Sequence, residues 1–261
     1  MIITLLSDFG NGDFLPGIAK GILLKEMPGA RIVDLSHDIS PHHLLQGCYF
    51  LKSSLPYFPE KTVHLSLIDW FVQNVENYLL AVVEGQVVIS ADNGLLPLAF
   101  GRKAEAVYAL AIQGRNFTEW LNGIARFLKS WQEEDYSRQG LSPTKARESS
   151  LPFEPYIEDN SIACQIIHVD RFGNVVLNLQ QSMFEAERKG RSFSINFSRH
   201  NALEQISQHY SDVPEGEKLC LFNAGGFMEI AVNHGSAAQL FGLSLTRQEQ
   251  LVYNKIKIVF S

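Results

Sequence analysis

The chain has few of the residues that hold small or metal-dependent proteins together. It contains three cysteines in 261 residues, and none of them forms a Cys-x-x-Cys pair. Cys48, Cys164 and Cys220 lie far apart in the sequence, so we expect neither a disulfide framework nor a cysteine zinc site. No His-x-His or His-Glu-x-x-His spacing occurs, and we therefore expect no metal site.

Positive charge and long apolar runs are also scarce. The formal net charge is −6 and no segment forms a basic cluster, which argues against nucleic acid or an anionic membrane as a partner. No run of 18 apolar residues is present, so no membrane-spanning helix is expected. The first residues lack the basic start and apolar core of a signal peptide. We expect a soluble protein in the reducing cytoplasm.

The first part of the chain alternates apolar, strand-like segments with helical ones. Strands are predicted at 2–6, 31–35, 62–68, 79–83 and 86–90, and helices at 14–26, 42–55 and 117–131. This alternation predicts an α/β N-terminal domain with a largely parallel sheet. We place that domain at residues 1–150, including a polar linker that begins at about residue 132 and is rich in charge, serine and proline.

The remainder of the chain has short apolar segments with few helix signals between them. Strands are predicted at 162–169, 175–179, 192–197, 218–223, 227–232 and 251–260. Many short strands separated by turns are typical of a compact all-β domain. We therefore expect a smaller β-rich C-terminal domain at 160–261.

Polar residues follow three predicted strands of the first domain. Asp8 follows the first strand, Ser36-His37-Asp38 follows the second and Asp69 follows the third. In open α/β sheets ligands bind outside the carboxyl ends of the strands, so these groups are candidates for one shared site. The alternative is that each aspartate closes a turn or caps a helix.

Five segments, in order along nearly the whole chain, match one family. They are Leu6-Ser7-Asp8-Phe9-Gly10 with Asp13 and Lys20-Gly21, Val33 to His37, Phe58 to Asp69, Ala91 to Leu96, and the C-terminal pair Val169 to Asn174 with Phe222 to Ala237. This ordered set resembles the S-adenosylmethionine hydrolases, also called S-adenosylmethionine hydroxide adenosyltransferases. These enzymes are relatives of the fluorinating and chlorinating enzymes.

The resemblance implies a fold, an assembly and a reaction. The fold is an α/β N-terminal domain followed by a β-barrel-like C-terminal domain. The assembly is a homotrimer with each site between two subunits. In the reaction, water attacks C5′ of S-adenosylmethionine and releases adenosine and methionine. A small nucleoside is therefore the expected ligand, and S-adenosylmethionine is the substrate or ligand with no further cofactor.

The resemblance also assigns roles to residues. Asp8 matches the residue that binds the ribose diol, and Asp13 and Asp170 match residues near the methionyl amine. Phe172 offers a flat face to adenine, and the Asn174 amide can read an adenine edge. Asn223 and Ala224 belong to the segment on the adenine and methionine side. Ala224 replaces a serine that contacts the substrate carboxylate in the halogenating relatives. The alternative for 170–174 is a simple tight turn.

The chain departs from the family at the groups that hold the attacking water. Asp69 is kept, but Glu76 stands where the family has arginine and Gln113 where it has histidine. Gln113 can hold a water molecule but cannot take up its proton, and Glu76 would raise the pKa of one of the two carboxyls. We therefore expect an impaired hydrolase that uses Asp69 and Gln113. The alternatives are a non-catalytic adenosine- or S-adenosylmethionine-binding protein and an enzyme with another nucleophile or adenosyl substrate.

Other side chains near Asp69 give weaker signals. Trp70-Phe71-Val72 predicts either a bulky loop lid over the pocket or ordinary loop packing. His64 lies five residues before Asp69 on a predicted strand, so the two side chains point to opposite faces. His37 lies at a strand end and is either a substitute catalytic group or a loop anchor. His42 and His43 are expected on the surface of a helix.

Overall fold

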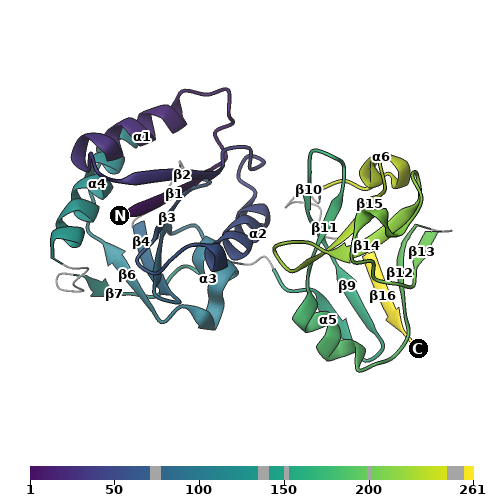
Figure 1. Ribbon diagram of the computed structural model, residues 1–261. Coiled ribbons are helices and arrows are strands. Elements are labelled where there is room, and N and C mark those ends of the chain that lie inside the picture. The colour runs from purple at the N-terminus through teal and green to yellow at the C-terminus, as the bar shows by residue number, and fades with distance from the viewer. Residues whose placement is uncertain (71–77, 135–140, 150–152, 199–200, 246–255) are drawn as a thin grey trace. The chain divides into compact units, whose positions relative to one another are not determined.

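The computed structural model describes residues 1–70, 78–134, 141–149, 153–198, 201–245 and 256–261. The chain divides into two compact units, Met1–Leu151 (unit 1) and Pro152–Ser261 (unit 2), and each has its own hydrophobic core (Figure 1). Glu76, Phe71 and Val72, which carry part of the expected departures, lie outside the described residues.

Unit 1 is built on a seven-stranded mixed sheet with the order β2-β1-β3-β5-β4-β6-β7. The half made of β2, β1, β3 and β5 is parallel, as the sequence predicts, whereas β4, β6 and β7 join in antiparallel register. The tight turn at Glu84-Gly85 forces β4 and β5 to be antiparallel neighbours. The strands are β1 (Ile2–Ser7), β2 (Arg31–Ser36), β3 (Val63–Leu67), β4 (Tyr78–Val83), β5 (Gln86–Ala91), β6 (Ala106–Leu110) and β7 (Ser142–Pro143).

Helices cover both faces of this sheet. Figure 1 shows α1 (Leu15–Glu26) and α4 (Phe117–Glu133) on one side and α2 (Leu44–Ser54) and α3 (Leu95–Phe100) on the other. Ile3 and Leu5 point to the first side and pack with α1 and α4, because alternate strand residues share a face. Leu121 and Leu128 of α4 are fully buried there.

The opposite face of the sheet buries a polar chain. His64 is fully buried, with Nδ1 2.8 Å from Thr4 Oγ1 and Nε2 2.6 Å from Gln86 Oε1. Burial lowers the pKa of His64, although the hydrogen bond with Gln86 partly opposes the shift. His64 is therefore a neutral group of the interior and not a site residue.

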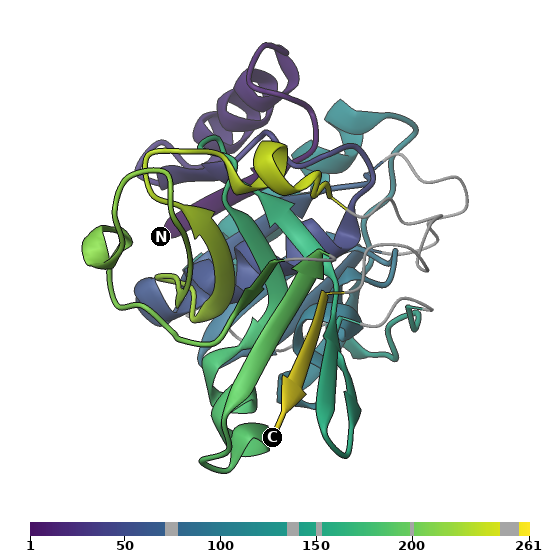
Figure 2. The same cartoon turned by 90° about the vertical axis from the view of Figure 1, so that its right-hand side faces the viewer.

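Unit 2 consists of two antiparallel sheets rather than a closed barrel among its described strands. One sheet has the order β10-β11-β15-β14 and the other β13-β12-β16-β9-β8. Figure 2 shows β16, in yellow, running between β12 and β9. The bounds are β8 (Tyr156–Glu158), β9 (Ser161–Cys164), β10 (Ile166–Val169), β11 (Val175–Gln180), β12 (Phe193–Ser198), β13 (Asn201–Leu203), β14 (Lys218–Phe222), β15 (Phe227–Val232) and β16 (Ile256–Phe260).

The expected strand 162–169 is broken at Gln165 into β9 and β10, which lie in different sheets. The break is held by Asn178, whose Oδ1 accepts a hydrogen bond from the Gln165 main-chain N–H at 2.7 Å. Two helices, α5 (Gln181–Arg188) and α6 (Ala237–Phe241), connect the strands. The barrel-like closure expected from the resemblance is thus replaced by strands that switch between two sheets.

All three cysteines are free and buried. Cys48 packs in unit 1, and Cys164 and Cys220 lie in the core of unit 2. Burial raises the pKa of each thiol. Within the described part of the chain, no helix has both the length and the apolar character needed to cross a bilayer.

Candidate functional site

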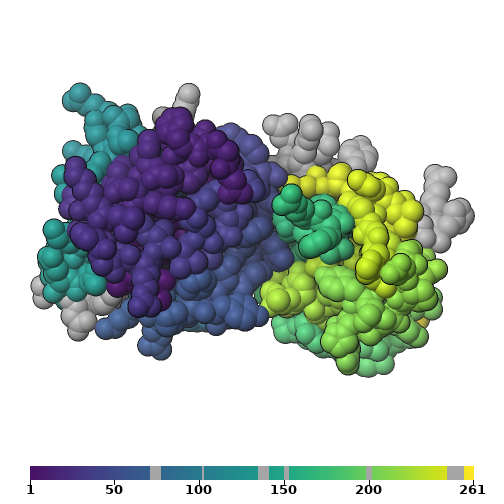
Figure 3. All heavy atoms as spheres, turned by 45° about the horizontal axis from the view of Figure 1, so that its top comes forward, coloured from purple at the N-terminus to yellow at the C-terminus, as the bar shows by residue number. Residues whose placement is uncertain are grey.

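The ends of three neighbouring strands bring polar side chains to one edge of the sheet in unit 1. Strands β2, β1 and β3 are adjacent and parallel, so their carboxyl ends meet at the same edge. His37 follows β2, Asp8 follows β1 and Asp69 lies two residues after β3. In Figure 3, the first part of unit 1 (purple to indigo), which contains these strands and the segments that follow them, forms much of the unit 1 surface facing the viewer.

Asp8 ties two loops of this edge together through one oxygen. Its Oδ2 accepts hydrogen bonds from the main-chain N–H of His42, at 2.9 Å, and of Asp69, at 3.1 Å. Both partners have left-handed backbones, with φ 62° for His42 and 49° for Asp69. Such a conformation costs a non-glycine residue about 1–3 kcal/mol, so the surrounding contacts must hold it. The Asp8 carboxylate supplies part of that support.

The same two residues meet through their side chains. His42 Nδ1 lies 2.6 Å from Asp69 Oδ1, with the His42 side chain 73% exposed and that of Asp69 21% exposed. A carboxylate can only accept, so Nδ1 is the donor. His43, which was expected at the surface, is buried. His42 is exposed, as expected, but it precedes α2, in the loop that follows β2, rather than lying on a helix. The position of that loop at the strand-end edge was the available signal.

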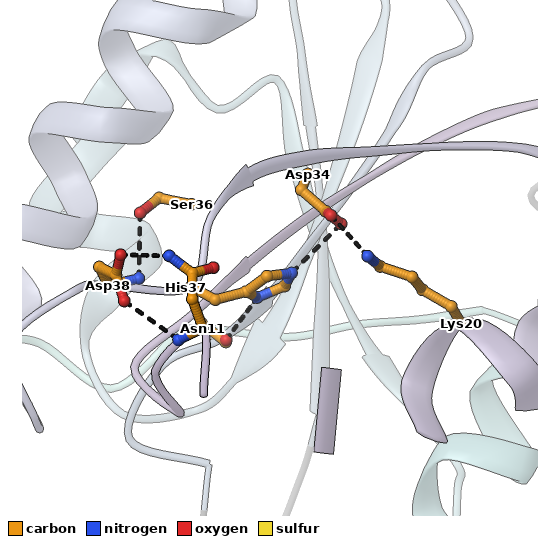
Figure 4. Close-up of polar contacts among 7 residues, drawn as sticks. Asn11, Lys20, Asp34, Ser36, His37 and Asp38 are labelled. Atoms are coloured by element: carbon orange, nitrogen blue, oxygen red, sulfur yellow. Dashed lines mark hydrogen bonds and ion pairs between the residues drawn. The ribbon is translucent and has the colours of Figure 1, made fainter. Parts of the chain in front are cut away.

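His37 has the strand-end position but anchors the loop (Figure 4). Its Nδ1 lies 2.7 Å from Ser7 Oγ and its Nε2 lies 3.2 Å from Asp34 Oδ1. Lys20 Nζ in turn contacts Asp34 Oδ2 at 2.5 Å. Partial burial by itself raises the pKa of Asp34, but the hydrogen bonds from Lys20 and His37 outweigh it and leave the pKa below its usual value. His37 is thereby fixed inside this polar chain.

The neighbouring loop residues have local structural partners. Asp13 Oδ1 accepts from the main-chain N–H of Leu15, at 2.9 Å, where α1 begins. Asp38 contacts both the main chain and the side chain of Asn11. Trp70 is buried in the core of unit 1, with its ring centroid 4.3 Å from that of Tyr78. For Trp70 the lid hypothesis is therefore wrong, and ordinary packing is what the structure has.

The cleft that Gln113 lines does not include Asp69. Gln113 is exposed and lines a cleft of about 390 Å³ between the end of β6 and α4. Three strand spacings separate β6 from β3 in the sheet, which is about 14 Å at roughly 4.8 Å each. The next residues serve the helix: a Cβ at Gly114 would overlap the Trp120 ring, and Asn116 caps α4 by accepting from the Glu119 N–H.

In unit 2, Asp170 organises the turn that carries Phe172 and Asn174. Its Oδ1 accepts from the main-chain N–H groups of Phe172 and Asn174 at 2.9 and 2.8 Å, and its Oδ2 accepts from Asn174 Nδ2 at 3.0 Å. The tight turn considered as the alternative is therefore present. It buries Asn174 and leaves the Phe172 side chain 77% exposed, so an aromatic face is displayed on a rigid turn.

This turn borders the cavity of unit 2. The cavity holds about 860 Å³, and the residues around it include Asp170, Phe172, Asn174, Tyr210, His234 and Ser236. Small-molecule pockets are typically ~300–1,000 Å³ and combine apolar walls with a few polar groups. The arrangement suits a flat, polar-edged ligand.

A buried carboxyl group supports the wall of this cavity. Glu229 accepts a hydrogen bond from Tyr210 Oη at 2.6 Å, and Asn223 Nδ2 lies 3.3 Å from its other oxygen. Burial raises the pKa of Glu229, the two hydrogen bonds lower it in part, and the negative charge of Asp170 raises it further. Asn223 Oδ1 also accepts from the main-chain N–H groups of Gly225 and Phe227, and Ala224 lies exposed on the turn that follows Asn223.

We expect Gly173→Ala to destabilise unit 2 more than an ordinary glycine replacement. Gly173 has φ +82°, and a Cβ there would lie 2.0 Å from Ser236 Oγ. Left-handed backbone costs alanine about 1–2 kcal/mol, and overpacking adds about 1–3 kcal/mol. Gly190→Ala is the matched control, because Gly190 has φ +77° with open space around it. Equal losses of unfolding free energy in urea would show that the Ser236 contact does not matter.

The charged groups of the described residues do not gather into a metal centre. In the parts of the chain that the structure describes, no three His, Cys, Asp or Glu side chains gather so that they could hold a metal ion. The two groups of site residues are instead carboxylates with a histidine in unit 1, and a carboxylate, an amide and aromatic rings in unit 2. Carboxylates attract cationic ligands, and the ring and amide suit a base.

Comparison with known proteins gives a consistent assignment. The sequence model of the SAM hydroxide adenosyltransferase N-terminal domain matches residues 3–125, and that of the C-terminal domain of the same family matches residues 164–249. The chain is 26% identical over 276 aligned positions to the (R)-S-adenosyl-L-methionine hydrolase of Methanocaldococcus jannaschii, covering 97% of this chain and 96% of that protein. It is 27% identical to the hydrolase of the same name from Thermus thermophilus, covering 92% and 95%.

More distant comparisons concern a segment or the fold alone. A 62-residue segment, 24% of this chain and 21% of its match, is 36% identical to a fluorinase of Actinoplanes. A crystal structure of an uncharacterised conserved protein from Thermotoga maritima superposes with a TM-score of 0.80 at 21% identity, covering 99% of this chain and all of that one. The fold is thus shared along the whole length.

Proposed function

Since the chain belongs to the SAM hydroxide adenosyltransferase family, we propose that it transfers the adenosyl group of S-adenosylmethionine to water and releases adenosine and methionine. The observation that carries this proposal is the Asp8–His42–Asp69 group at the strand ends of unit 1. It places a carboxylate and an imidazole side by side at the edge where α/β sheets bind ligands.

The charge of the substrate fits these groups. S-adenosylmethionine carries a positive sulfonium and a positive ammonium group, and Asp8 and Asp69 supply negative charge. Among the contacts of the described residues, Asp8 uses Oδ2 for the two main-chain N–H groups, and we propose that Oδ1 binds a ribose hydroxyl. The sulfonium is already a good leaving group, so positioning of water and electrostatics are what the protein must add.

We propose that the cavity of unit 2 receives the adenine. Phe172 would stack on the base, and the Asn174 side chain would contact its edge. The resemblance to the family implies both roles. Support comes from the hydrogen-bonded turn that exposes the Phe172 ring, which lines a cavity of about 860 Å³. Asp170 and Asp13 remain proposed partners of the methionyl amine, which their negative charge favours.

We further propose a closed homotrimer, in which unit 1 of one subunit and unit 2 of a neighbour complete each site. The resemblance to the family implies this assembly; the proposed ligand groups are divided between the units, with Asp8 and Asp69 in unit 1 and Asp170 and Phe172 in unit 2. Light scattering should then give three times the mass of one 29.3 kDa chain. A mass of one chain at micromolar concentration would contradict the assembly.

The test of the reaction is incubation of the purified protein with S-adenosylmethionine, with adenosine and methionine measured by chromatography. The names of the relatives specify (R)-S-adenosyl-L-methionine, so the two epimers at sulfur are assayed separately, and we expect the (R) epimer to be the better substrate. Nucleoside binding is followed by the melting temperature, which a ligand of the folded state raises. Asn174→Ala should reduce that rise.

A non-catalytic binding protein is the second candidate. It is favoured by the presence of Gln113 at the position of the family histidine, because Gln113 cannot act as a base and lines the β6–α4 cleft. A rise in melting temperature with adenosine, together with no product from either epimer, would support the binding protein and reject the hydrolase.

A further inference from the structure

We propose that Glu229 gives the cavity of unit 2 its preference for a positively charged ligand, so that this buried carboxylate favours S-adenosylmethionine over neutral adenosyl compounds. The inference rests on the proposed function, which places the adenosyl ligand at that cavity. It makes Glu229 a specificity-determining residue that acts through its charge rather than by touching the ligand.

The first argument is the position of Glu229 behind the cavity wall. Glu229 belongs to β15 and is only 4% exposed. Its Oε1 accepts a hydrogen bond from Tyr210 Oη at 2.6 Å, and Tyr210 is one of the residues around the cavity. Glu229 itself is not among the described residues that line it. One side chain therefore separates the carboxylate from a ligand in the cavity.

The second argument is that donors are placed at both oxygens of this carboxyl group. Oε1 accepts from Tyr210, and Oε2 accepts from Asn223 Nδ2 at 3.3 Å. An ionised carboxyl group is an acceptor at both oxygens, and hydrogen bonds to the charged form favour it. The two contacts thus hold the charge of Glu229 in a fixed place.

The third argument is that this charge has no positive partner in the described part of the chain. None of the ion pairs among the described residues includes Glu229. Burial raises the pKa of Glu229, the two hydrogen bonds oppose the shift, and the negative charge of Asp170 adds to it. A buried carboxylate is costly unless a positive charge compensates it. A cationic ligand in the cavity would supply that compensation.

The neighbours of Glu229 in the sheet do not offset its charge. Val176 on β11 and Leu221 on β14 lie opposite Glu229 in the strand register, and both are buried and apolar. An apolar surrounding lowers the effective dielectric constant, so a charge acts more strongly across it than across water. The field of Glu229 therefore reaches the cavity with less screening than that of a surface carboxylate.

The substrate of the proposed reaction carries the matching charge. S-adenosylmethionine has a positive sulfonium and a positive ammonium group, whereas the product adenosine has neither. Asp170 borders the cavity, so its charge and that of Glu229 act on the same ligand from the wall and from behind it. We expect the cavity to bind the charged substrate more tightly than the neutral nucleoside that remains after the reaction.

The experiment compares two stable ligands of similar shape. S-adenosylhomocysteine has a neutral thioether, and sinefungin has an ammonium group beside the position of the sulfonium; neither has a sulfonium leaving group. Their dissociation constants are measured by titration calorimetry. We expect the wild-type protein to prefer sinefungin, and Glu229→Gln to lower that preference roughly tenfold, which is about 1.4 kcal/mol.

Two further variants separate charge from structure. Glu229→Asp keeps the charge but is too short for both hydrogen bonds, so the affinities for the two ligands should fall together and their ratio should stay near that of the wild type. Glu217→Gln removes the same charge from an exposed position of unit 2, where salt screens it. The ratio should not change in this control.

The possible failures are distinguishable. Equal affinity of the wild-type protein for the two ligands would overturn the role of Glu229 without any variant. An equal loss of both affinities in Glu229→Gln would also overturn it, because the residue would then have a structural role alone. In both cases adenosyl binding and the hydrolysis assay would still stand. Binding of neither ligand to the wild-type protein would reject the adenosyl site, and the role of Glu229 with it.

Discussion

Asp69→Asn is expected to lower the hydrolysis of S-adenosylmethionine by roughly 10²–10⁴-fold, the scale seen when a positioned acid–base group is lost. The asparagine would keep the size of the side chain and tolerate the left-handed backbone at this position. It would lose the negative charge beside the His42 ring, which we expect to help position the attacking water. The measurement is kcat with each sulfur epimer, on protein whose melting temperature has been checked.

Because the melting temperature of the variant is checked, a loss of turnover can be assigned to the reaction and not to unfolding. The main-chain N–H at position 69 still donates to Asp8 in the variant, so the loop should remain folded and adenosine should bind. Unchanged turnover in Asp69→Asn would show that another group holds the water, and Asp69 would no longer be a catalytic candidate.

Asp8→Ala is expected to abolish both activity and nucleoside binding, because it removes the acceptor that holds His42 and Asp69 together. Two main-chain N–H groups would lose a charged partner, which costs roughly 2–4 kcal/mol of unfolding free energy at about 1.5–3 kcal/mol each, reduced for partial exposure. The two left-handed residues would also relax. Turnover is expected to fall by at least ~10³-fold, through misplacement of the groups that position the water.

Asp8→Asn is the matched variant for this experiment. Its side-chain oxygen can still accept from both N–H groups, so most of the stability should return. Its weaker acceptor and lack of charge should leave ribose binding impaired. A melting temperature in Asp8→Ala equal to that of the wild type would mean that this carboxylate does not brace the site.

The sequence predicts unit 1 well for a physical reason. Each strand of the parallel half contains several apolar residues and is followed by a turn, so β1, β2, β3 and the hairpin of β4 and β5 lie within a few residues of their expected bounds. The antiparallel half of the sheet depends on long-range pairing of β6 with β4 and β7, which local periodicity does not contain. The sequence therefore did not predict the antiparallel half of the sheet, which the structure shows.

The candidate site was only partly visible in the sequence for a similar reason. Asp8 and Asp69 were found because strand ends can be located from apolar runs. His42 was not, because its role depends on a left-handed backbone and on a contact with a residue 27 positions away. In unit 2, the broken strand at Gln165 depends on Asn178, a side chain that nothing in the local pattern distinguishes.

The burial of all three thiols makes the chain suitable for site-directed chemical labelling. Cys48, Cys164 and Cys220 lie in the cores with a raised pKa, and the thiolate is the form that reacts with maleimides and other electrophiles. The folded protein should thus be nearly silent toward such reagents. A single new cysteine in place of exposed Phe172 would then carry a fluorophore alone, without any background replacement of native residues. Its emission would report on the surroundings of that turn, without signal from the native thiols.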